Sequence, residues 1–110
     1  MIVRTWRGRT SILNQPAYVE HFRRNVIPEL QAIRGFLGSS LLRRNLSSEV
    51  EVFVLTKWTS MDAIRMFAGS DIERAVVAPD AAAVLVEYDH TVVHYEIVHE
   101  VNPAVESQPG

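Results

Sequence analysis

The pattern of hydrophobic and polar positions predicts four strands, with helical spacing of apolar residues between them. Residues 2–9 alternate apolar with polar residues and are rich in β-forming residues, and further strands are expected over residues 39–45, 50–58 and 90–98. Between the first two, apolar residues recur at every fourth position and predict a helix with one apolar stripe. That stripe consists of Tyr18, Phe22, Val26 and Leu30.

Local signals set the expected ends of the helices. Asn14 is expected to cap the first helix, and Pro28 to kink or end it near Ile27, because the residue before proline avoids the α region. Thr59 or Ser60 is expected to cap the next helix, which Gly69 ends; with Thr59 as cap, Asp62 takes a capping-box position. Two short helical turns, split by Pro79, are expected over residues 71–77 and 80–86.

The resulting order of elements is β-α-β-β-α-β. This order predicts an α+β, ferredoxin-like fold, with a four-stranded antiparallel sheet and its helices on one face. The third strand is apolar on both faces, since Val52 and Val54 alternate with Phe53 and Leu55. The last strand repeats the pattern, with Val93 and Tyr95 on one side. A second copy of the chain can cover the bare face, so we expect a two-fold homodimer that closes into a dimeric α+β barrel.

Composition narrows the class of protein. The chain has 110 residues, which fits one domain, expected over 1–101 with a flexible tail at 102–110. A net charge of −2 with scattered basic residues gives no reason to expect a nucleic-acid partner. Cysteine is absent, which excludes disulfides and a cysteine nucleophile. No apolar run has the length of a membrane span, so we expect no membrane partner and a cytoplasmic protein.

Several short stretches resemble the antibiotic biosynthesis monooxygenase family, whose members fold as dimeric α+β barrels. The similarity runs over roughly residues 2–98, and the matching stretches are residues 2–8, 34–38, 54–64, 67–71 and 94–97. The family includes cofactor-free oxygenases of aromatic polyketides, haem-degrading oxygenases and quinol oxygenases. The resemblance therefore implies a small-molecule oxygenase that needs no cofactor.

The resemblance also implies which positions carry chemistry. In the polyketide-oxygenase branch a tryptophan at the end of the third strand lines the pocket, and Trp58 matches it. The same branch has an asparagine where this chain has Val54 and a tyrosine where it has Ile64. The haem-degrading branch has a histidine where this chain has Val76, and an asparagine on the first strand that this chain lacks. Haem degradation by those residues is therefore not expected.

Four side chains are candidates for a pocket and its chemistry. Trp58 is either a core aromatic or a pocket wall, and Trp6 has the same alternatives. His94 is a candidate base or hydrogen-bond donor, provided that its side of the strand faces the helices; otherwise it is a structural histidine bonded to backbone or to Glu96. Arg4 shares a strand face with Trp6 and either meets an anionic ligand or forms a solvated or dimer ion pair.

The helices supply the remaining candidates. His21 could close the pocket from above, beside Tyr18 and Phe22, or lie partly exposed at the edge of the apolar stripe. Phe67 belongs to the buried face of the later helix. The histidines lack the spacing of a metal site, so neither a metal nor another cofactor is expected.

Two function classes remain from the sequence. The first is a cofactor-independent monooxygenase of a small aromatic, phenolic or quinol-like compound, with His94 as base and Trp58 as aromatic wall. The second is a dimeric barrel of the same fold that binds small ligands without catalysis or has a role in stress, which the apolar residues at Val54 and Ile64 favour. Haem binding with His94 as the axial ligand is a third, weaker hypothesis.

Overall fold

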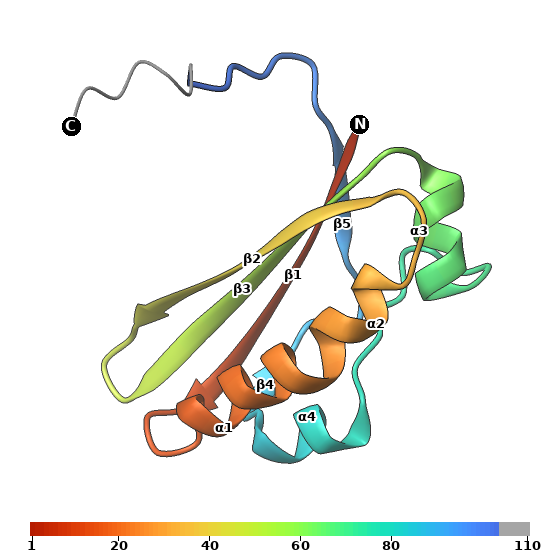
Figure 1. Ribbon diagram of the computed structural model, residues 1–110. Coiled ribbons are helices and arrows are strands. Elements are labelled where there is room, and N and C mark those ends of the chain that lie inside the picture. Colours follow the sequence, from red (N-terminus) through yellow and green to blue (C-terminus); the bar gives the residue numbers. More distant parts are fainter. Residues whose placement is uncertain (104–110) are drawn as a thin grey trace.

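A computed structural model describes residues 1–103 and contains one antiparallel sheet with its helices on one face (Figure 1). The strand order is β2-β3-β1-β4, and β5 also pairs with β1. The ferredoxin-like α+β fold is thus confirmed, with five strands where four were expected. The strands are β1 (Ile2–Ser11), β2 (Phe36–Asn45), β3 (Glu49–Trp58), β4 (Glu87–Tyr88) and β5 (Val93–Glu96).

The irregularity expected near Pro28 takes the form of a π-helical stretch just before it, and the chain is α-helical again around the proline. The first helical segment consists of α1 (Gln15–His21), a π-helical stretch (Phe22–Val26) and α2 (Ile27–Gln31). Proline lacks the N–H that an uninterrupted α-helix would use, and the widened turn before Pro28 accommodates it within the first turn of α2. Asn14 holds the N-cap position, although its side chain makes no capping hydrogen bond.

The second helix, α3 (Met61–Ala68), begins at Ser60, whose hydroxyl accepts a hydrogen bond from the Ala63 N–H at 3.2 Å. Of the two expected caps, Ser60 is therefore correct, and the capping box from Thr59 is not formed. Gly35 lies in the turn before β2 with a φ of +97°. A Cβ there would approach the Ala63 Cβ to 2.6 Å, so this turn requires glycine.

Two expected elements differ in the structure. Residues 71–77 form no helix, and only α4 (Pro79–Val84) is helical in that region. The final strand, expected over residues 90–98, is shortened to β5, and β4 is an additional short strand; residues 89–92 between them stand opposite only Trp6 and Arg7 of β1. The Asp89 N–H still donates to the Arg7 carbonyl of β1 at 3.0 Å, whereas the Val92 N–H donates to the Glu73 carbonyl of the preceding loop at 2.8 Å.

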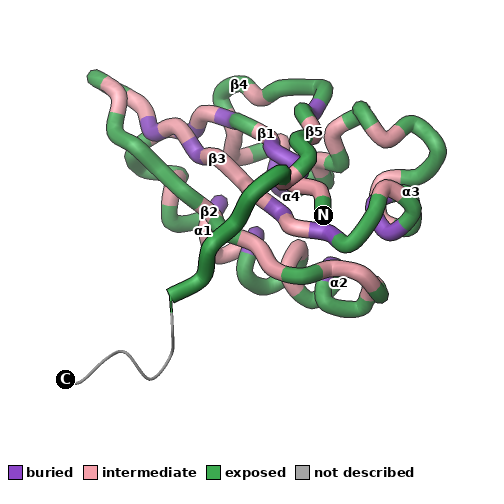
Figure 2. Tube along the Cα trace, turned by 90° about the horizontal axis from the view of Figure 1, so that it is seen from above, coloured by how far each residue is buried: buried purple, intermediate pink, exposed green. Residues whose placement is uncertain are grey.

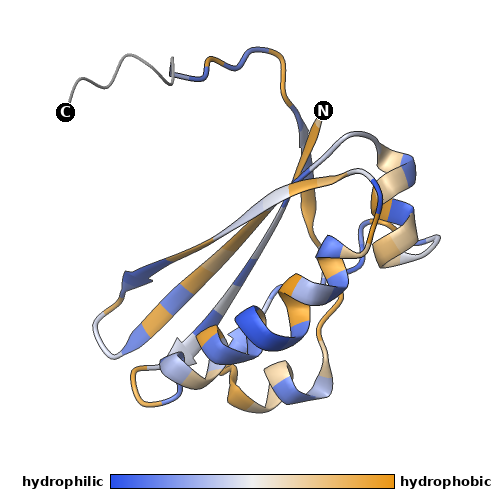
Figure 3. Ribbon diagram, in the orientation of Figure 1, coloured by the Kyte–Doolittle hydropathy of each residue, from blue (hydrophilic) through white to orange (hydrophobic). Residues whose placement is uncertain are grey.

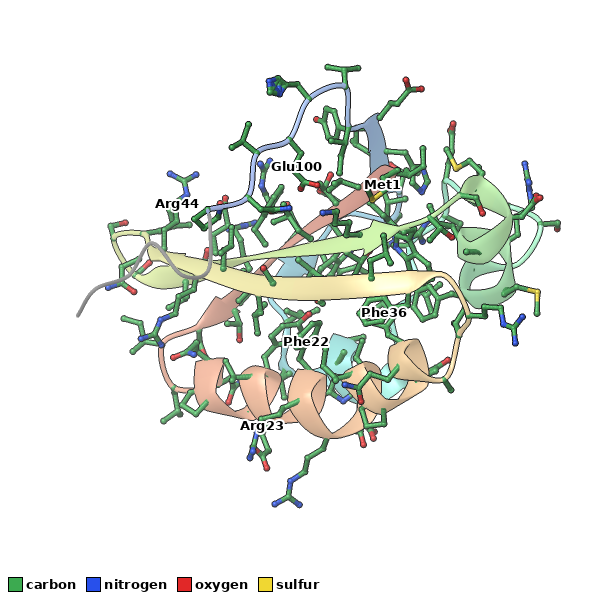
Figure 4. The ribbon with its side chains drawn as sticks, turned by 45° about the horizontal axis from the view of Figure 1, so that its top comes forward. Met1, Phe22, Arg23, Phe36, Arg44 and Glu100 are labelled. Atoms are coloured by element: carbon green, nitrogen blue, oxygen red, sulfur yellow. The ribbon has the colours of Figure 1, made fainter. Side chains whose placement is uncertain are left out.

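The two faces of the sheet have different surroundings. Phe22 points from the helices toward the sheet, whereas Arg23 points away, and Arg44 and Glu100 lie on the sheet's opposite side (Figure 4). Most of the buried positions therefore lie between helices and sheet, along β1, β3 and the inner helical surfaces (Figure 2). β3 is apolar along its middle (Figure 3). By the alternation of the strand, Val52 and Val54 face the helices, and Phe53 and Leu55 face the open side.

Two buried clusters fill the space under the helices. One contains Tyr18, Phe22, Val52 and Ala81, with Trp6 packed against it. The other contains Leu30, Trp58, Ala63 and Ile64. Among residues 1–103, no helix is long and apolar enough to cross a membrane. The predicted tail at 102–110 lies, from residue 104 on, outside the described residues.

Candidate functional site

A cavity opens between the sheet and the helices at the end of the molecule occupied by Trp6. Its volume is about 100 Å³, below the roughly 300–1,000 Å³ of drug-sized ligand sites, so it suits a small ligand. β1 and β3 form its floor, the first helical segment and α4 form its sides, and residues 76–78 close one edge. Most of its wall is apolar, with Arg4, Trp6, Tyr18, His21, Glu29 and Thr56 as the groups that carry polar atoms.

Trp6 is the large aromatic surface of the cavity. Its ring stacks on Tyr18 at a centroid distance of 6.1 Å and an interplanar angle of 25°. The indole N–H donates to the Asp89 carbonyl at 2.8 Å, which fixes the orientation of the ring. Of the two tryptophans, Trp6 is therefore the one that lines the cavity.

Gly8 provides the space that the Trp6 ring occupies. A Cβ at residue 8 would lie 2.8 Å from the tip of the Trp6 indole, closer than real Cβ contacts allow. Any other residue would push the ring off β1. The indole can therefore lie along the strand only because the residue two positions ahead, on the same face, has no side chain.

Arg4 lies at the floor of the cavity and is only 5% exposed. Its guanidinium donates to the carbonyls of Ile72 at 2.5 Å and Arg74 at 2.9 Å, and contacts the His94 Nε2 at 3.0 Å. The centre of the guanidinium lies 5.9 Å from the Phe67 ring centroid. Burial lowers the pKa of Arg4 to about 10, so this group carries its charge at neutral pH.

His94 lies on the helix-facing side of the sheet, directly beside Arg4 in the pairing of β1 and β5. It does not line the cavity, because the Arg4 guanidinium occupies the position in front of it. Burial, and then the charge of Arg4, lower the pKa of His94, and Glu73 opposes the shift. A neutral imidazole can accept a hydrogen bond from the Arg4 guanidinium through Nε2. The geometry therefore places His94 in contact with the arginine and not with the cavity.

Trp58 is fully buried and does not line the cavity. Its indole N–H donates to the Thr56 hydroxyl at 2.8 Å, which leaves no indole hydrogen for a ligand. The ring packs 6.0 Å from Phe67, and Phe67 does line the cavity. Trp58 thus packs against a residue of the cavity wall without lining the cavity itself.

The helices contribute Tyr18, Phe22 and His21 to the cavity, as expected from the sequence. Tyr18 is 4% exposed, and burial raises the pKa of its hydroxyl, which therefore stays protonated. The His21 Nδ1 lies 3.0 Å from the Asn25 Nδ2. The imidazole of His21 is therefore the one that reaches the cavity wall among residues 1–103.

Val54 and Val76, the positions that carry polar residues in the two family branches, both line the cavity. Ile64 is fully buried in the other cluster. The structure also adds wall residues that the sequence analysis did not select, Thr56, Ala81 and Val92. Thr56 could have been found from the pairing of antiparallel strands, since it shares a face with Val54. Within residues 1–103, no group of three acidic or histidine side chains could hold a metal ion.

Solved structures with this fold include enzymes of two kinds. MhuD, the haem degrader of Mycobacterium tuberculosis, is 21% identical in a variant carrying two manganese protoporphyrin IX molecules per active site. The match covers 94% of this chain and 100% of that one, with a TM-score of 0.67. The monooxygenase ActVA-Orf6 of Streptomyces coelicolor, solved with nanaomycin D, is 18% identical over 94% of this chain and 92% of that one, with a TM-score of 0.59.

A third structure is SnoaB, a cofactor-independent oxygenase of Streptomyces nogalater. It is 19% identical over 93% of this chain and 98% of that one, with a TM-score of 0.56. A search among curated proteins found no match. The family model described as antibiotic biosynthesis monooxygenase matches residues 13–79, more than half of the chain. The protein therefore belongs to the antibiotic biosynthesis monooxygenase family.

Proposed function

We propose that the protein is a cofactor-independent monooxygenase that acts on a small aromatic compound of the phenol or quinol type. The observation that supports this most strongly is the apolar cavity with Trp6, Tyr18, Phe22 and Phe67 in its wall. An aromatic ring would gain both buried area and stacking contacts there. Family membership supports the reaction type, since SnoaB, which has the same fold, is a cofactor-independent oxygenase.

The proposed reaction begins with loss of a proton from the substrate hydroxyl. The resulting anion passes one electron to O₂, and the superoxide and substrate radical combine to form a C–O bond in a peroxide anion. The peroxide takes up the proton, its O–O bond breaks, and water leaves, so that one oxygen atom stays on the substrate. Of the two histidines proposed from the sequence, His21 is in position to take the proton, because it lies on the cavity wall. His94 and Trp58 act as positioning residues, through Arg4 and Phe67 respectively. The apolar wall keeps water away from the radical pair.

Oxygen uptake with anthrones or hydroquinones tests this proposal. Wild-type protein is expected to accelerate uptake above the rate without protein, and Ala81→Phe to abolish the acceleration by filling the cavity. Ala83→Phe is the matched control, because Ala83 lies exposed on the same helix. Equal uptake in wild type, Ala81→Phe and the protein-free sample would contradict an oxygenase function.

A second candidate is a non-catalytic protein that binds small aromatic ligands. Val54 and Val76 favour it, because both line the cavity at positions where oxygenase branches of the family carry polar groups. Ligand binding without any oxygen uptake in air would support this candidate over the first.

We further propose that the active unit is a homodimer joined through the open sheet face. That face carries Leu42, Val93 and Tyr95, each about half exposed at 50%, 52% and 57%. Such a surface, continuous with the apolar middle of β3, is typical of an interface with a second sheet. Sedimentation equilibrium is expected to give a mass of twice 12.4 kDa, and Val93→Lys to shift the mass toward that of one chain. A monomer at all concentrations would contradict the dimer.

A further inference from the structure

The three arginines of β1 have different surroundings. Arg7 lies 3.5 Å from the Glu51 carboxylate, and Arg9 forms ion pairs with Glu49 and Glu87. Both point to the open face of the sheet. Arg4 points to the helix-facing side, is 5% exposed, and none of its contacts among residues 1–103 is a carboxylate. The strand therefore buries the one guanidinium for which it provides no counter-ion.

A buried charge without a counter-ion is costly, and a fold retains it only where something compensates for it. Two backbone carbonyls and the neutral His94 supply part of the compensation. They engage Nη1 and Nη2, while a guanidinium has five N–H donors. The cavity borders the same group. The guanidinium thus keeps unused N–H donors and its charge at the border of this cavity, whose wall also contains the Glu29 carboxylate.

Arg4 and Trp6 lie two residues apart on one strand face, and both border the cavity. A ligand that places its ring against Trp6 and Tyr18 would bring a substituent toward the guanidinium. Phe67, whose ring lies 5.9 Å from the guanidinium centre, adds a second aromatic surface at that end. The positive group and the aromatic surfaces together match one chemical class of ligand.

We propose that the cavity selects aromatic monoanions, with the ionised oxygen group on Arg4 and the ring against Trp6. Carboxylates and phenolates share this chemistry. The inference rests on the proposed function only in that the ligand enters this cavity. In the proposed reaction, Arg4 holds the substrate anion that forms when the hydroxyl loses its proton.

A purely structural role is the competing explanation, because Arg4 ties the carbonyls of Ile72 and Arg74 to the sheet. Those two bonds would hold the loop even if no ligand ever reached the guanidinium. A structural tether, however, gives no preference between a charged ligand and an uncharged one of the same shape. Charge preference is therefore the property that separates the two explanations.

The test is calorimetric binding without any turnover. Two matched pairs of probes are used at pH 8: 2-naphthoate against 2-naphthamide, and 4-nitrophenolate against 4-nitroanisole. An ionised group on a guanidinium adds about one to two powers of ten in affinity, so each anion is expected to bind at least about ten-fold tighter than its neutral partner. A preference for only one of the two anions identifies the oxygen group that the site takes. Equal binding within each pair would overturn the inference.

Three variants locate the preference. Arg4→Met is expected to bring each pair to within about two-fold, while the neutral compounds bind as before. Arg44→Met removes an exposed arginine of the opposite face, which is paired with Glu51, and is expected to keep the wild-type preference. Arg4→Lys keeps the charge and is expected to retain part of the preference, which allows a result if Arg4→Met fails to fold. A full preference in folded Arg4→Met would overturn the inference.

Failure of the inference and failure of the proposed function give different results. Anion preference that depends on Arg4, without oxygen uptake, supports the ligand class and removes the oxygenase. Oxygen uptake with neutral ethers bound as tightly as phenolates supports the oxygenase and removes the ligand class.

Discussion

The two clusters under the helices each contain one tryptophan, and they differ in how completely they are filled. Around Trp58, the side chains of Leu30, Ala63 and Ile64 are at most 7% exposed, and of these three only Leu30 reaches the cavity wall. Around Trp6, the packing stops at a cavity that holds polar atoms from three sides. One end of the interior is thus closely packed, and the other borders a cavity.

The indole N–H groups of the two tryptophans also have different acceptors. The Trp58 indole N–H finds its acceptor within the core, at Thr56 on the same strand. The Trp6 indole N–H reaches instead to the backbone of Asp89, in the segment between β4 and β5. That segment therefore also anchors the aromatic wall of the cavity.

The largest expected effect is a difference in stability between variants of the two tryptophans. Trp58→Ala removes a fully buried ring and is expected to lower the free energy of unfolding by about 3–5 kcal/mol. Trp6→Ala, at the hollow end, is expected to cost less than about half as much, because its ring already borders empty space. Urea unfolding of both variants measures the difference. Equal losses would mean that the two ends are packed alike.

A second pair of variants adds volume instead of removing it. Ala63→Phe overpacks the filled end and is expected to cost at least about 1–3 kcal/mol of unfolding free energy. Ala81→Phe enters the cavity and is expected to cost less than Ala63→Phe while it abolishes ligand binding. Thermal unfolding and calorimetry measure the two effects. If Ala81→Phe destabilised the protein as much as Ala63→Phe, the space beside Ala81 would not be available to a ligand.

A smaller effect is expected from Gly8→Ala, which leaves Trp6 in the sequence but displaces its ring. The added Cβ would meet the indole at 2.8 Å, so the ring must shift and weaken its bond to Asp89. The affinity for an aromatic ligand is expected to fall by about ten-fold, equivalent to roughly 1.4 kcal/mol. Ser40→Ala, on the open face of the sheet, is the control. Gly38→Ala is not used, because Gly38 has a positive φ. Unchanged affinity in Gly8→Ala would show that the position of Trp6 is not critical.

The smallest expected effect is a pH dependence of stability. Burial and then the Arg4 charge lower the pKa of His94 in the folded state, against an opposing influence of Glu73. Its contribution is therefore fully present above the unfolded value, near 6.5, and is lost as the pH falls through that value toward the lower folded pKa. His94→Gln, which keeps an acceptor for Arg4, is expected to lose less unfolding free energy than wild type on acidification. Parallel pH curves would contradict this account of His94.

The sequence pattern was sufficient for the order of elements and for the two-sided apolar character of β3. It could not show that residues 71–77 would form only a single hydrogen-bonded turn, from Asp71 to Arg74, and no helix, because the cause is tertiary. The carbonyls of Ile72 and Arg74 accept hydrogen bonds from Arg4, nearly 70 residues earlier. The Ala75 N–H likewise donates to the His90 carbonyl at 2.8 Å. These long-range bonds override the local preference.

The structure gathers most of the predicted site residues around one cavity, and their roles stay predictions. Trp6, Arg4, Tyr18, His21, Phe22 and Phe67, all selected from the sequence, line the cavity. Trp58 and His94 were given the leading roles, and both lie one layer behind the wall. Periodicity assigns a residue to a face of a strand. It does not tell which residue on that face stands in front, since this depends on neighbours from other strands.

The central claim is that a ligand binds beside Trp6 and not beside Trp58, and the two tryptophans allow it to be measured directly. The chain has only two, so a ¹H–¹⁵N spectrum contains two indole N–H signals, assigned by Trp6→Phe, and 2-naphthoate can be titrated against both. The account predicts a saturable shift of the Trp6 signal while the Trp58 signal, enclosed in the filled cluster, stays in place. A shift of Trp58 with Trp6 unmoved would contradict it, and so would two signals that both remain still.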